Sequence, residues 1–117
     1  MAQAAVALGL DSLAGVGAHS QALARLEALE EERDAARRYW EEKPTLAKKF
    51  RDEMRPVLLR DAASPQQFPM SLHGTQRALV AVFPYAIFFI QLHEAIYIIA
   101  VAHTSREPGY WRNRLPT

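Results

Sequence analysis

The stretch Pro84–Ala102, PYAIFFIQLHEAIYIIAVA, decides the fold. It is almost wholly apolar, and its nineteen residues would suffice for a transmembrane helix. Three polar residues stand at its centre: Gln91, His93 and Glu94. A carboxylate at that depth in a bilayer costs about 2–3 kcal/mol, which argues against a spanning helix. The polar residues instead divide the stretch into two strand-length runs, so we expect a β-hairpin of Ala86–Leu92 and Ala95–Ala102.

A third strand precedes this hairpin. Within Arg77–Phe83, Leu79 and Ala81 alternate with Val80 and Val82, and the turn Phe83-Pro84-Tyr85 has the length of a hairpin connection. Because the last two strands are apolar at nearly every position, we expect both faces of the sheet to be covered. Residues Arg60–Gly74 hold two prolines and a glycine and are typical of a loop.

Helical periodicity lies upstream, from about Ser20 to Glu42. One stripe has the spacing of a 3.6-residue helix: Ala22, Leu26, Leu29, Ala36 and Trp40. The opposite face has the mixed charge of a solvated surface: Glu30, Glu31, Arg37, Arg38 and Glu41. The pattern predicts an amphipathic helix that packs on the sheet.

A second helix follows the break at Lys43-Pro44. Thr45 is a candidate N-cap, and apolar residues continue at helical spacing as far as Leu58. Pro56 should kink this helix or end its regular part near Arg55. The fold class is therefore α+β, an N-terminal helical hairpin packed on a small antiparallel β-sheet. We expect one domain over residues 19–117, after a loose Ala/Gly-rich leader over residues 1–18 in which a short helix around Ala2–Leu10 is an alternative.

The amino-acid composition excludes several classes of functional site. The 117 residues include no cysteine, which excludes disulfides, thiolate metal sites and thiol nucleophiles. Fourteen Lys and Arg against thirteen Asp and Glu leave a net charge of +1, too little for a chain that coats nucleic acid by charge alone. No Lys or Arg precedes Arg25, so neither a secretory signal nor a transit peptide fits, and we expect a cytoplasmic protein.

Polar groups gather directly after the last strand, where sites often form. Arg106 could hold a phosphate or carboxylate, His103 or Tyr110 could move a proton, and Trp111 could stack on a base. The structural alternatives are Trp111 as a lid on the core, His103 as a half-buried histidine, and Arg106 and Glu107 as partners of the helical layer.

The segments ERDAARRYWEEKPTLAKKFRDEM (32–54), GTQRALVAVFPYAIFF (74–89) and IYIIAVAHTSREPGYWRNRL (96–115) resemble the RelE/ParE toxin superfamily of type II toxin–antitoxin systems. The shared features are an aromatic pair before the helical turn, an arginine that opens a strand, and a last strand that runs into His103 and Arg106. Family members usually begin with a short strand before the first helix. Here the corresponding residues, Ala18–Arg25, look helical or leader-like.

The resemblance to the ParE branch implies a plasmid-stabilisation toxin that arrests growth by binding DNA gyrase. Such a toxin needs a binding surface and no catalytic set. The candidate target-binding residues are Arg77, Tyr85, Arg106, Trp111 and Arg112.

The RelE branch implies instead a ribosome-dependent mRNA endonuclease, with His103, Arg106 and Tyr110 as candidate catalytic residues. That chemistry uses several Lys, Arg and Tyr groups, yet the last lysine of the chain is Lys49. We therefore favour the gyrase-binding hypothesis. A third alternative is an inactive, degenerate toxin that has lost the first strand of the sheet.

Partners follow from the same resemblance. We expect a cognate antitoxin that adds a helix or strand to the toxin surface. Strands as apolar as AIFFIQL and AIYIIAVA, beside an amphipathic helical hairpin, are consistent with a groove or sheet edge that another chain covers. We expect no cofactor, no metal and no membrane association.

Overall fold

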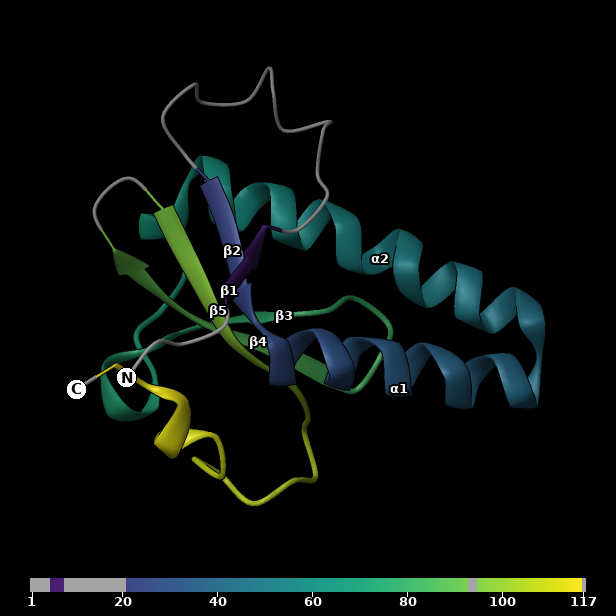
Figure 1. Cartoon of the computed structure of the whole chain (residues 1–117). Coiled ribbons are helices and arrows are strands. Elements are labelled where there is room, and N and C mark those ends of the chain that lie inside the picture. Colours follow the sequence, from purple (N-terminus) through teal and green to yellow (C-terminus); the bar gives the residue numbers. More distant parts are fainter. Residues whose placement is uncertain (1–4, 8–20, 93–94, 117) are drawn as a thin grey trace.

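The computed structural model describes residues 5–7, 21–92 and 95–116. The protein is α+β, with two long helices and a mixed sheet (Figure 1). Its elements follow the order β1 (Ala5–Ala7), β2 (Gln21–Arg25), α1 (Leu26–Glu42), α2 (Pro44–Ala63), β3 (Gln76–Leu79), β4 (Tyr85–Leu92) and β5 (Ala95–His103). The two predicted strands of the apolar stretch are confirmed as β4 and β5. None of the helices in the described ranges is long and apolar enough to cross a bilayer.

The sheet has the strand order β1-β2-β5-β4-β3. β2 runs parallel to β5, with Leu23 opposite Tyr97, and the other neighbours are antiparallel. The expectation of a purely antiparallel sheet is therefore wrong. It failed because β2 lies beside a strand that is distant in sequence, and hairpin spacing cannot reveal such a pairing.

The residues before α1 form a strand, not the helix that the periodicity from Ser20 predicted. Five residues are too few to separate a period of 3.6 from one of 2, and pairing with β5 decides the conformation. Arg25 is extended (φ −64°, ψ 147°), and α1 begins at Leu26. Further upstream, Ala5–Ala7 is a strand that pairs with β2, not part of a helix. The remainder of the predicted leader lies outside the described residues.

The buried face of α1 differs from the predicted stripe. Ala28, Ala35 and Ala36 are buried, whereas Leu26 is exposed and Trp40 is 60% exposed. Tyr39 packs in place of Trp40, with its ring 5.3 Å from that of Phe50. Leu29 is half-buried against the core, so the predicted stripe is right at Leu29 and Ala36 and wrong at Leu26 and Trp40.

Helix α2 also corrects two expectations. Pro44 occupies its first turn after Lys43, and Thr45 makes no capping hydrogen bond. The helix continues past Pro56 to Ala63, because Met54 and Val57 on either side are buried in the core. Residues Arg60–Ala63 therefore belong to α2, and the predicted loop is shorter and contains the 3-10 turns Pro65–Gln67 and Leu72–Gly74.

β3 is shorter than the predicted strand and ends at Leu79 instead of Phe83. Val82, with a positive φ of 74°, is 77% exposed in the connection to β4. The turn closes where the backbone N–H of Val80 donates to the carbonyl oxygen of Tyr85, at 3.0 Å. The link between β4 and β5, His93-Glu94, lies outside the described residues.

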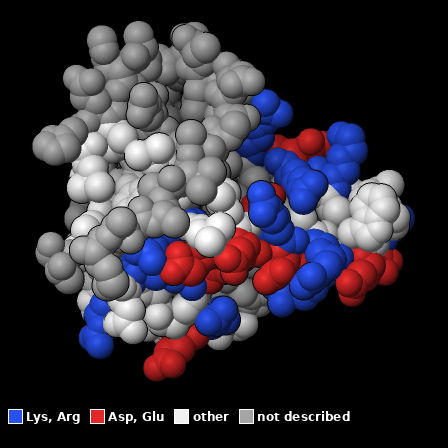
Figure 2. All heavy atoms as spheres, viewed as in Figure 1, with Lys and Arg blue, Asp and Glu red and all other residues white. Residues whose placement is uncertain are grey.

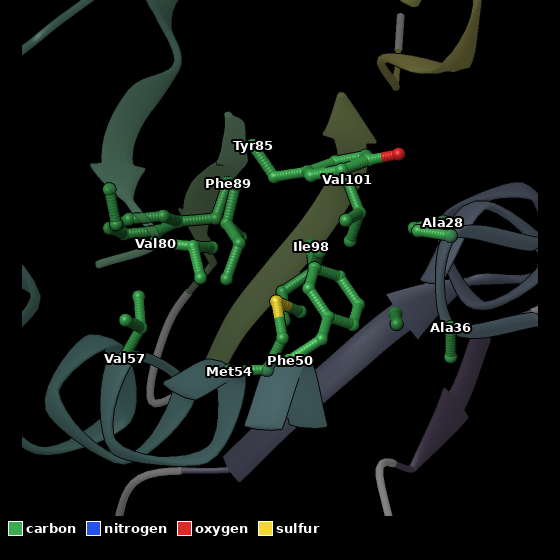
Figure 3. Packing of buried hydrophobic residues seen from close by; sticks show 14 of the residues in the cluster. Ala28, Ala36, Phe50, Met54, Val57, Val80, Tyr85, Phe89, Ile98 and Val101 are labelled. Atoms are coloured by element: carbon green, nitrogen blue, oxygen red, sulfur yellow. The ribbon is translucent and has the colours of Figure 1, made fainter. Parts of the chain in front are cut away.

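Two hydrophobic layers sandwich the sheet, which confirms that both faces are covered. On one face the helical hairpin packs Phe50, Met54 and Val57 against Ile98 and its neighbours (Figure 3). We call the other face the tail face, because residues 104–116 cross it and bury Trp111 there. The Trp111 ring lies 4.7 Å from that of Phe88, and a short 3-10 turn (Arg112–Arg114) follows.

Candidate functional site

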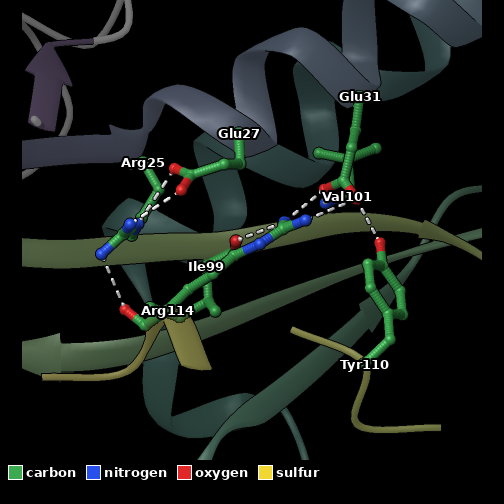
Figure 4. Close-up of polar contacts among 7 residues, drawn as sticks. All are labelled: Arg25, Glu27, Glu31, Ile99, Val101, Tyr110 and Arg114. Carbon is green, nitrogen blue, oxygen red and sulfur yellow. Dashed lines mark hydrogen bonds and ion pairs between the residues drawn. The ribbon is translucent and has the colours of Figure 1, made fainter. Parts of the chain in front are cut away.

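Glu31 of α1 is the centre of a polar cluster between the first helix and the tail (Figure 4). Its side chain is only 15% exposed and accepts hydrogen bonds from the Arg114 guanidinium (2.7 and 3.1 Å), the Tyr110 hydroxyl and the Val101 backbone N–H (3.1 Å). The prediction that Glu31 lies on a solvated face is wrong. Its carboxylate fastens the tail to α1 and β5.

A second ion pair extends this cluster to β2. The Arg25 guanidinium bonds Glu27 at 2.8 and 3.1 Å and donates to the carbonyl oxygen of Arg114 at 3.0 Å. The bond from Arg25 is the main cause that lowers the pKa of Glu27 to about 2. The end of β2, the start of α1 and the tail are thus held together by charged hydrogen bonds.

Tyr110 and Arg106, two of the predicted nuclease residues, come together in the tail. The Arg106 guanidinium lies 3.7 Å from the centroid of the Tyr110 ring, a cation–π contact. Burial, followed by the hydrogen bond to Glu31, raises the pKa of Tyr110 above its ordinary value of 10. A phenol held in this way stays protonated at neutral pH, and its O–H already donates a hydrogen bond to Glu31.

His103, the third predicted nuclease residue, faces a different group of side chains. Its Nδ1 accepts a hydrogen bond from the Ser105 backbone N–H at 3.0 Å and lies 2.7 Å from the Ser105 hydroxyl. Its ring lies edge-on to Tyr85, with centroids 5.2 Å apart. His103 is half-buried, and its carbonyl oxygen accepts a hydrogen bond from the Arg106 backbone N–H at 3.0 Å, whereas its ring faces Ser105 and Tyr85.

Arg38 is a residue that sequence reasoning missed. Its Nη2 donates to the Tyr85 hydroxyl at 3.0 Å, so that Arg38, Tyr85 and His103 follow one another at the end of β5. In the described part of the chain Arg38 makes no ion pair. The helical pattern assigned it to the solvated face and carried no signal of the tyrosine, which is contributed by β4.

The predicted target-binding residues divide into exposed and buried groups. Arg77, Arg106 and Arg112 are exposed. Tyr85 (4% exposed) and Trp111 (1% exposed) are buried, so Trp111 has the alternative role of a lid on the core. Arg77 is paired with Phe88, and directly paired residues share a face of the sheet, so Arg77 also lies on the tail face.

Charge is mixed elsewhere on the surface. In Figure 2 acidic and basic side chains alternate over the helical hairpin, without an extended basic stripe on the face shown. Across residues 5–7, 21–92 and 95–116, no three His, Asp or Glu side chains gather so that they could hold a metal ion. No protein-family model and no curated protein sequence matches this chain.

Proposed function

We propose that the chain is the toxin of a type II toxin–antitoxin system, similar to the RelE/ParE superfamily, and that it arrests growth by binding DNA gyrase. The observation that carries the proposal is the element order: strand β2, the helical hairpin, then three strands, with β2 beside β5. The sequence resemblance implies such a strand before the first helix. β2 supplies a strand at that position, which supports the proposal of a toxin with a complete sheet.

Fold alone does not specify function, so the arrangement of the candidate site residues has to distinguish a binding toxin from a catalytic one. Arg106 lies on the ring of Tyr110, but the Tyr110 hydroxyl donates to Glu31 and the His103 ring faces Ser105 and Tyr85. The side chains of the two candidate proton-transfer groups are thus engaged with different partners. The tail face instead presents the exposed cations Arg77, Arg106 and Arg112, which suit an acidic protein surface. This arrangement favours a binding toxin.

A cognate antitoxin remains the proposed partner. Large apolar side chains are exposed at or next to the edge strand β3, namely Met70, Leu79 and Val82. The beginning of β3 is already paired, since Met70 bridges Gln76 and the backbone N–H of Arg77 donates to the carbonyl oxygen of Pro69 at 3.1 Å. The end of β3, beside the exposed Leu79 and Val82, is the surface that an added strand or helix would cover.

The test is inducible expression of residues 1–117 in a bacterium with a DNA-damage reporter. We expect growth arrest with a strong reporter signal, and inhibition of purified gyrase in a supercoiling assay. The triple variant Arg77→Gln/Arg106→Gln/Arg112→Gln should relieve both effects. A control that removes three exposed cations from the helical hairpin, Arg33→Gln/Arg37→Gln/Lys49→Gln, should leave them intact.

Two outcomes would count against gyrase as the target. Arrest with a silent reporter, relieved by His103→Ala, would support the mRNA nuclease, for which the row Arg38, Tyr85 and His103 is the relevant grouping. Normal growth of cells that accumulate the folded chain would refute the toxin proposal itself.

A further inference from the structure

A cavity of about 290 Å³ opens between the helical hairpin and the sheet, on the face opposite the tail. Its walls come from four elements and include Ala28 and Leu29 of α1, Met54 of α2 and Ile98 of β5. Alanines at Ala24 and Ala28 leave the space that larger side chains would fill. The volume is near the lower end of the range for ligand cavities, roughly 300–1,000 Å³.

One carboxylate is set deeper in this cavity than its other acidic and basic neighbours. The Glu32 side chain is 24% exposed, against 59% for Arg51 and 60% for Asp52. Asp52 already pairs with Lys48 at 2.7 Å, whereas the nearest guanidinium nitrogen to Glu32 belongs to Arg51 at 3.6 Å. The part of the chain that the structure describes gives Glu32 no hydrogen bond.

A largely buried carboxylate without a hydrogen-bond donor is costly. Burial is the main cause that raises the pKa of Glu32, and Arg51 offsets it only in part. A ligand that supplies a charged donor at this point would recover the lost hydrogen bonds. The aliphatic walls beside Glu32 would at the same time accept an apolar chain.

We propose that this cavity binds a linear aliphatic cation, with its alkyl chain against Leu29, Met54 and Ile98 and its ammonium or guanidinium group on Glu32. The proposal does not depend on the toxin function. A free aliphatic amine and the lysine or arginine side chain of a bound protein share this chemistry. The charged residues that line the cavity are Glu32 and Asp52 against Arg51 and Arg55, and Glu32 is the most buried of the four. We therefore expect the deep carboxylate of Glu32 to favour a cationic ligand.

The test is a titration of the full chain, made by cell-free synthesis and labelled for NMR, with hexylammonium, hexanol and hexanoate. We expect hexylammonium to shift the methyl signals of Ala28, Leu29 and Ile98 and to bind about tenfold more tightly than hexanol, because of its charge-assisted hydrogen bond. Hexanoate should bind more weakly than hexanol.

Glu32→Gln keeps the side-chain shape and should abolish the preference for hexylammonium over hexanol. Glu30→Gln removes the same charge from the exposed side of the same helix and should leave the preference unchanged. A capped peptide with a single lysine separates the two sources: tighter binding than hexylammonium at the same methyl signals assigns the site to a protein side chain, and weaker binding assigns it to a free amine.

Three results would overturn the proposal. Hexanol or hexanoate could bind as tightly as hexylammonium, Glu32→Gln could retain the preference, or the shifts could arise outside the cavity. Each would mean that Glu32 does not select a cation.

Discussion

Glu31 makes more tertiary contacts than its position in a charged stretch of helix suggests. It accepts hydrogen bonds from the tail at Arg114 and Tyr110 and from the β5 backbone at Val101. A carboxylate with this many donors is well satisfied although it is largely buried. Removal of one partner would leave a buried charge or donor unpaired, and that loss is what makes such clusters sensitive to substitution.

Tyr110 should make the stability of the protein depend on pH in the alkaline range. Its pKa is raised in the folded state, so it contributes stability that is complete below pH 10 and is lost as the pH rises above that value. Between pH 10 and 12 the free energy of unfolding should fall more steeply for the wild type than for Tyr110→Phe. Urea unfolding at a series of pH values measures both slopes.

The difference between the two slopes isolates Tyr110, because the other tyrosines and the lysines are common to both proteins. Equal slopes would show that the Tyr110 hydroxyl titrates alike in the folded and unfolded chains.

The sequence predicted which residues of the tail are chemically interesting, but not their partners. Glu30 and Glu31 are neighbours in a run of acidic residues, and nothing local distinguishes them. Of these two residues, Glu31 is the one that receives hydrogen bonds from Tyr110 and Arg114 of the tail, which lie about 80 positions further along the chain. Arg38 was missed for the same reason, since Tyr85 reaches it from β4.

Among the elements, those with a long and regular pattern were predictable. The two helices and the strands β4 and β5 follow from periodicity and from continuous apolarity, and all four are present. β2 was missed because its conformation depends on pairing with β5, and β3 was predicted too long because its end depends on the turn before Tyr85. Short elements take their structure from distant neighbours.

Helix α2 provides a prediction at this scale. Pro56 lies inside the helix, where proline lowers helix stability by about 3 kcal/mol relative to alanine. Proline also restricts the unfolded chain, which offsets about 1 kcal/mol of this loss. Pro56→Ala should therefore raise the free energy of unfolding by about 2 kcal/mol. Urea denaturation of the variant and the wild type measures this gain.

Pro44 is the matched control, because it occupies the first turn of the same helix, where a missing N–H costs nothing. Pro44→Ala should change stability by less than about 1 kcal/mol. A loss of stability in Pro56→Ala would mean that the core around Met54 and Val57 requires the proline.

On the scale of the whole molecule, the protein is a three-layered structure, with the helical hairpin, the sheet and the tail stacked in that order. The α+β class was predictable from helices that precede strands, and the cover on both faces from the apolarity of β4 and β5. The mixed character of the sheet was not predictable, because the parallel pairing of β2 with β5 joins segments that are distant in sequence.

The two tryptophans test the contribution of the tail layer. Trp111 is 1% exposed and Trp40 is 60% exposed. Trp111→Ala should destabilise the protein by about 3–5 kcal/mol through the cavity that it leaves. Trp40→Ala should change stability by no more than about 0.5 kcal/mol. Thermal unfolding followed by circular dichroism measures both.

Equal effects of the two substitutions would show that the tail does not contribute to the folded core. The expected difference also bears on function. Loss of growth arrest in Trp111→Ala, at a temperature where that variant unfolds, would report on folding and not on target binding.

The position of β2 has a consequence for biosynthesis. β2 and α1 are translated before β5 and before Arg114, the tail residue that bonds to Glu31. Until β5 and the tail have been synthesised, β2 lacks its parallel partner and α1 lacks its charged contact with the tail. The sheet therefore cannot be completed while only the segments before β5 have been synthesised.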